Sequence, residues 1–136
     1  MPYQVLSHTA DSGIEASAGT LADLIAEMAT GMFDLMAPST PGDEGVPVEI
    51  ELQASTIEDL VVDVLSELLY ESEAGDLILT DFRVTMPDTN HARVTARGVA
   101  MSKTEMSGPP IKAVTYHDLV VEERPDGWFG RVYFDV

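Results

Sequence analysis

Apolar and polar residues alternate along several short stretches of this chain, a pattern that predicts strands. The clearest stretch is residues 48–53, where Val, Ile and Leu alternate with Glu, Glu and Gln. A period of two is typical of a strand with one buried face. The same pattern, together with residues of high strand propensity, predicts further strands over 3–7, 14–18, 77–85, 91–101, 111–116, 119–123 and 128–134.

Two longer stretches repeat apolar residues at helical spacing. The first runs from residue 21 to residue 36 and follows Thr20, a residue type that caps helix starts, with Asp23 at the third helical position. The second follows Thr56, carries two acidic residues in its first turn, and is expected to end at Gly75. Both predicted helices are amphipathic.

The order of these elements predicts an α+β fold. Two strands, a helix, a strand and a second helix are followed by four or five strands. We expect a two-layer sandwich in which both helices pack on one face of a largely antiparallel sheet. A length of 136 residues without an internal repeat or linker predicts one domain spanning residues 1–136.

Charge narrows the range of possible functions. The chain has 24 acidic and 7 basic residues, a net charge of −17, and its first 82 residues contain no Lys or Arg. Nucleic acids and anionic membranes are bound through Lys and Arg, so neither is an expected direct partner. The acidity is typical of a solubilising surface, and it also suits a surface that steers a basic partner.

Cysteine is absent, which excludes disulfides, thiolate zinc sites and cysteine nucleophiles. The first residues lack the basic and apolar regions of a signal peptide, and no apolar stretch is long enough to span a membrane. We therefore expect a cytoplasmic protein.

No standard catalytic motif is present, and His8, His91 and His117 lie on different predicted elements.

Aspartates near the two chain ends are the first candidates for chemistry. Asp11 is expected in a polar loop between the first two strands. Its carboxylate can instead have only a local role there, accepting hydrogen bonds from backbone N–H groups of a turn. Asp135 and the terminal Val136 directly follow a predicted strand. If that strand pairs near the first ones, both carboxylates and the chain-end carboxylate form a cluster of hard oxygen ligands, which suits calcium or magnesium.

Lys112 is the third candidate. It is one of only two lysines and lies in the apolar stretch 111–114. A lysine at a sheet edge can prevent edge-to-edge aggregation. Next to a carboxylate cluster, it can instead pair with a carboxylate or donate to a phosphate.

Three segments give the chain a resemblance to the archease family. They are His-Thr-Ala-Asp at 8–11, Ile-Lys-Ala-Val-Thr-Tyr-His at 111–117, and an ending with Gly-Trp at 127–128 and Val-Tyr-Phe-Asp-Val at 132–136. The second and third segments together are specific. The length and the order of elements also fit, so the resemblance covers essentially the whole chain.

This resemblance implies a non-catalytic activator of an RtcB-type RNA ligase, which joins RNA ends in tRNA splicing and RNA repair. The family protein promotes guanylylation of the ligase histidine from GTP and allows multiple turnovers. The resemblance also implies a divalent-metal site formed by Asp11, Asp135 and Val136, with Lys112 and His8 as further functional residues. Calcium is the expected metal, with magnesium or manganese as alternatives.

Two positions depart from the family pattern. Ser7 stands where an acidic residue is expected before His8, and Val99 follows Gly98 where a glutamate is expected.

The residues by themselves are also compatible with two other functions. One is a metal-dependent phosphoester hydrolase that uses the aspartates, with His8 or His117 as general base. The other is an acidic, chaperone-like binding module.

Overall fold

The computed structural model describes residues 3–7, 11–37, 45–104 and 106–136. Long helices and antiparallel strands make up most of these residues. In chain order, the elements are β1 (Tyr3–Ser7), β2 (Asp11–Ala18), α1 (Leu21–Met36), β3 (Val46–Gln53), α2 (Ile57–Gly75), β4 (Leu77–Asp88), β5 (His91–Ala100), the short 3-10 helix η1 (Met101–Lys103), β6 (Ala113–Val114), β7 (Val120–Arg124) and β8 (Gly127–Asp135).

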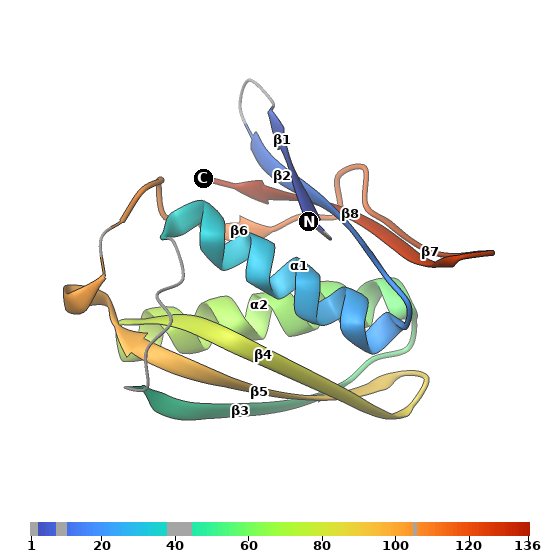
Figure 1. Ribbon diagram of the computed structural model, residues 1–136, viewed down its shortest axis with the longest axis horizontal. Helices are drawn as coiled ribbons and strands as arrows, with labels where there is room; N and C mark the ends of the chain where they lie inside the picture. Colours follow the sequence, from blue (N-terminus) through green and yellow to red (C-terminus); the bar gives the residue numbers. More distant parts are fainter. Residues whose placement is uncertain (1–2, 8–10, 38–44, 105) are drawn as a thin grey trace.

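The strands form two antiparallel sheets. One has the order β1-β2-β8-β6, with β7 also paired to β8, and the other has the order β3-β5-β4. Both helices contact strands of both sheets and lie between them (Figure 1). The predicted α+β class with antiparallel pairing is therefore confirmed. The structure differs from the expected arrangement in one respect: two sheets enclose the helices, whereas one sheet covered on one face was expected.

The burial of α1 explains why two sheets are needed. Its residues 31–33 are all buried, and three consecutive helical residues span about 200° of the helix surface. A Cβ atom added to Gly31 would lie 2.9 Å from Ile14 Cδ1 of β2, so the helix approaches that strand closely. On another side, Phe33 stacks on Phe82 of β4 with 5.6 Å between ring centroids. One sheet could not cover both sides.

The helix ends agree with the sequence predictions. The Thr20 hydroxyl accepts a hydrogen bond from the Asp23 amide, and the Thr56 hydroxyl accepts one from the Asp59 amide, both at 3.1 Å. Helix α2 ends at Gly75, as expected. Within the described residues, neither helix combines the length and the apolar character that a membrane span requires.

Several strand boundaries differ from the predicted ones. Strand β2 begins at Asp11, where a loop was expected through Gly13, because Ser12 and Gly13 pair with β1 on one side and β8 on the other. The predicted strand at 111–116 is reduced to Ala113–Val114. Strand β4 extends to Asp88, beyond the predicted end at residue 85.

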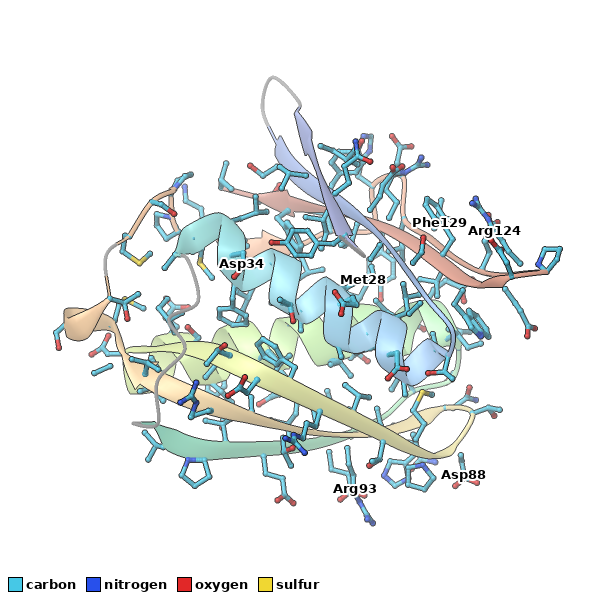
Figure 2. All side chains as sticks on the ribbon, viewed as in Figure 1. Met28, Asp34, Asp88, Arg93, Arg124 and Phe129 are labelled. Atoms are coloured by element: carbon cyan, nitrogen blue, oxygen red, sulfur yellow. The ribbon has the colours of Figure 1, made fainter. Side chains whose placement is uncertain are left out.

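Strand β1 is joined to α1 through a tyrosine. The Tyr3 hydroxyl donates a hydrogen bond to Asp34 Oδ2 at 2.5 Å (Asp34 is labelled in Figure 2). Burial of Tyr3, followed by its hydrogen bond to Asp34, raises the pKa of this tyrosine to about 12. The phenol therefore stays protonated in the folded protein at pH values where an unfolded tyrosine ionises.

This pKa shift predicts a loss of stability at alkaline pH. An unfolded tyrosine loses its proton near pH 10, so the free energy of unfolding decreases as the pH rises from about 10 to about 12. We expect Tyr3→Phe to remove part of this decrease. Urea denaturation at about pH 9 and about pH 11 measures it, with Tyr70→Phe at an exposed position as the control. An equal alkaline loss in wild type and Tyr3→Phe would contradict the assignment.

Candidate functional site

Pairing between β2 and β8 brings together the two aspartates predicted from the chain ends. The strands are antiparallel, and their register places Asp11 directly opposite Asp135. Directly opposite residues share one face of the sheet, with Cβ atoms about 4.5–5.5 Å apart. The final strand thus pairs beside the beginning of β2, the condition on which the predicted carboxylate cluster depended. Val136 follows Asp135 and is 38% exposed.

Lys112 reaches the same end of the sheet from the other side of β8. Its backbone N–H donates to the Asp135 carbonyl oxygen at 2.7 Å, and Ala113 pairs with Asp135. Asp135 therefore lies between Asp11 of β2 and the segment that carries Lys112. The side chains of Asp135 and Lys112 are both exposed.

The charge of Lys112 is not engaged by a described carboxylate. Four arginines form ion pairs with acidic side chains: Arg93 with Glu51, Arg97 with Asp81, Arg124 with Glu122 and Arg131 with Glu15. Among the side chains that the structure describes, no carboxylate lies within 4.0 Å of the Lys112 ammonium.

Tyr116 is a structural residue of this region that sequence reasoning did not single out. Its hydroxyl donates to Asp59 Oδ1 of α2 at 2.7 Å and joins the segment after Lys112 to the first turn of the helix. This hydrogen bond is the main reason why the pKa of Tyr116 is raised to about 12. The hydrogen bond joins residues that are 57 positions apart, so no local pattern in the sequence predicts it.

The two described histidines lie beside acidic residues other than Asp135. His91 contacts Glu51 on the other sheet, and His117 lies beside Asp118. His8 falls outside the described residues. Among the residues that are described, no three His, Asp or Glu side chains converge as a set of metal ligands. The predicted metal site thus depends on the two aspartates and the chain-end carboxylate.

Two of the hollows in the described part of the chain lie at opposite ends of the helices. The larger, about 700 Å³, is lined by the starts of both helices and by Trp128, which pairs with Ala18 at the end of the β2–β8 ladder farthest from Asp135. The smaller, about 370 Å³, has Lys112, Glu73 and Asp76 in its wall. Its remaining lining is mainly apolar and consists of Met36, Leu69, Ser72, Met101, Pro110 and Ile111. Only the smaller hollow borders the predicted site.

Comparison with known proteins identifies the family. The model of the Archease protein family matches residues 3–136. The chain belongs to the archease family. It is 31% identical over 140 residues to the Protein archease of Pyrococcus furiosus, covering 98% of both chains. It is 32% identical over 139 residues to that of Methanosarcina acetivorans, covering 98% of this chain and 95% of the relative.

Solved archease structures share this fold. The solution structure of Methanobacterium thermoautotrophicum protein 1598 matches with a TM-score of 0.84 at 22% identity, over 99% of both chains. The crystal structure of a Thermotoga maritima archease, described as a possible chaperone, matches with a TM-score of 0.69 at 25% identity, over 98% of this chain and 96% of that one. The resemblance drawn from the sequence motifs is thus confirmed.

The two departures from the family pattern lie in different sheets. Ser7 is the last residue of β1 and pairs with Ser12, the neighbour of Asp11. Val99 pairs with Ile78 in the three-stranded sheet. Of the two departures, only Ser7 lies beside the pair formed by Asp11 and Asp135.

Proposed function

We propose that this archease is a non-catalytic activator of an RtcB-type RNA ligase and promotes ligase guanylylation and multiple turnover in tRNA splicing or RNA repair. The observation that carries the proposal is the register that sets Asp11 opposite Asp135, with the Lys112 backbone bonded to Asp135. These are the residues to which the archease resemblance assigns function, and they come from three separate parts of the chain.

A divalent-metal site at this end forms part of the proposal. Asp11, Asp135 and the Val136 chain-end carboxylate would hold the cation. Their donor set fits, because carboxylate oxygens are the hard ligands that calcium, magnesium and manganese prefer. Calcium is the first candidate, and water or backbone oxygens would complete its six to eight ligands. When bound, the cation supplies positive charge that can hold phosphate oxygens.

Exposure of the site favours an activator over an enzyme. Asp135, Val136 and Lys112 are exposed. Figure 1 shows β8, which ends at Asp135, running to the end marked C. Many enzymes enclose the reacting atoms of the substrate in a cleft, whereas an exposed group can be inserted into the active site of another protein. Lys112, with no described carboxylate at its ammonium, can donate to a phosphate oxygen there.

The charge distribution suits a basic protein partner. The seven basic residues all follow residue 82, and within the described part of the chain four of them form ion pairs. A long-range negative field speeds association with a positively charged ligase and repels free RNA. RNA and GTP would then be bound mainly by the ligase, while this protein contributes Lys112 and the metal at the junction.

A divalent cation is predicted to raise the melting temperature. A cation present at about 100 times its dissociation constant stabilises the folded state by about 2.7 kcal/mol, which corresponds to about 10 °C for a domain of this size. Melting scans with EDTA, calcium, magnesium and manganese measure this shift. Asp135→Asn should abolish it, whereas Asp126→Asn at the β7–β8 turn should leave it unchanged. The site is refuted if no cation shifts the wild-type melting temperature.

The activator role is tested with the purified ligase. Under multiple turnover, wild-type protein should accelerate ligase guanylylation and RNA joining. We expect Asp135→Ala and Lys112→Ala to lower the rate at least about tenfold, an effect of at least about 1.4 kcal/mol, while Asp126→Asn acts as wild type. Circular dichroism checks that the variants are folded.

Two results would contradict the activator role. One is equal stimulation by wild type and by folded Asp135→Ala and Lys112→Ala. The other is hydrolysis of phosphoester substrates by this protein alone, which would favour the hydrolase. Binding to many unrelated basic proteins, lost steeply as salt rises, would instead favour a general binding module.

A further inference from the structure

The pair formed by Asp11 and Asp135 lies at the open end of its ladder. Asp11 is the first residue of β2, and Asp135 is the last residue of β8. The ends of strands open with little cost in free energy, and two like charges directly opposite each other weaken the pairing further. Some other contact must hold this end of the ladder closed.

Gly13 and Tyr133 form the next pair on the same face. They lie directly opposite each other, two residues from the aspartates on each strand. A Cβ atom built on Gly13 would lie 2.6 Å from Tyr133 Cδ1 and 2.8 Å from Cε1. The tyrosine ring therefore occupies the space that any larger residue at position 13 would need. An aromatic ring that covers a cross-strand glycine stabilises an otherwise weak position of the strand.

Tyr133 also holds the segment that carries Lys112. Its carbonyl oxygen accepts hydrogen bonds from both the backbone N–H and the hydroxyl of Thr115, each at 3.0 Å. Its ring contacts that of His117, with centroids 5.9 Å apart. Tyr133 is thus joined to β2 through its ring and to the 112–117 segment through its carbonyl and its ring.

We propose that Tyr133, packed on Gly13, is the positioning residue of the archease site. It keeps Asp11 opposite Asp135 and holds the Lys112 segment beside them. This inference rests on the proposed metal site. If the ladder end is closed for only a tenth of the time, the apparent metal affinity falls about tenfold, because only the closed form is competent to bind.

Calcium titration of Tyr133 variants tests the proposal. Isothermal titration calorimetry is carried out at a temperature where circular dichroism shows each variant to be folded. Tyr133→Ala should weaken calcium binding at least about tenfold, whereas Tyr133→Phe, which keeps the ring on Gly13, should stay within about threefold of wild type. If Tyr133→Phe is as weak as Tyr133→Ala, the ring is not the positioning element and the proposal fails.

Phe129 provides a matched control. It is a half-buried aromatic residue on the same face of β8, four positions away, and its ring packs under Arg124 at 3.9 Å (Figure 2). Phe129→Ala removes a comparable ring from the other end of the strand. It should lower the melting temperature but leave calcium affinity within about threefold of wild type. An equal loss of affinity in Phe129→Ala and Tyr133→Ala would reduce the effect to general destabilisation and overturn the proposal.

A double mutant tests the contact between the two residues. Gly13→Ala displaces the ring and should weaken calcium binding in the wild-type background. In the Tyr133→Ala background, the same substitution should have little further effect, because no ring is left to displace. Additive losses would show that Gly13 and Tyr133 act independently, against the proposal.

Amide exchange separates this inference from the metal site on which it rests. The amides of Lys112 and Thr115 donate to the carbonyls of Asp135 and Tyr133, and their exchange is measured by NMR without added metal. Tyr133→Ala should speed both at least about tenfold, and Phe129→Ala should not. Unchanged exchange in Tyr133→Ala would refute the positioning role. If wild type binds no calcium but exchange responds as expected, only the proposed metal site fails.

Discussion

The pairing of β2 with β8 is the interaction on which the rest of the structure depends. Ile14 pairs with Val132, and both side chains are fully buried in the core. Because side chains alternate along a strand, the register that turns these residues inward sets positions 11 and 135 together on the opposite face. A slip of one residue would expose the core side chains. Core burial therefore specifies the candidate site.

This arrangement places groups together that would not pair by themselves. Two acidic residues directly opposite each other destabilise an antiparallel pair. Burial of Ile14, Val132 and Phe134 between the sheet and the helices offsets this cost. Local rules are most often broken at functional sites, where the surrounding structure supplies the compensation.

Local signals in the sequence were sufficient for the helices and for most strands. Thr20 and Thr56 cap helices as predicted, because capping depends on residues only three positions apart. The division into two sheets could not be predicted in this way. Burial of Gly31 and Phe33 shows that α1 needs cover on two sides, but no local pattern tells which strands supply it. Asp11, Ser12 and Gly13 resemble a turn locally. Pairing of Ser12 and Gly13 with strands on both sides, and of Asp11 with β8, makes them the start of a central strand.

The candidate site residues stand out in the sequence through their positions and through the family motifs, whereas the contacts that hold them together do not. Tyr133 and Gly13 are 120 positions apart, and their contact follows only from the ladder register. The same holds for Tyr116 and Asp59, which join the Lys112 segment to α2. The net charge of the chain does not tell which basic side chains form ion pairs. Arg93 and Arg97 do so, whereas no described carboxylate forms an ion pair with Lys112. The backbone hydrogen bond from Lys112 to Asp135 fixes this lysine at the end of β8, and strand pairing, which net charge does not describe, determines that placement.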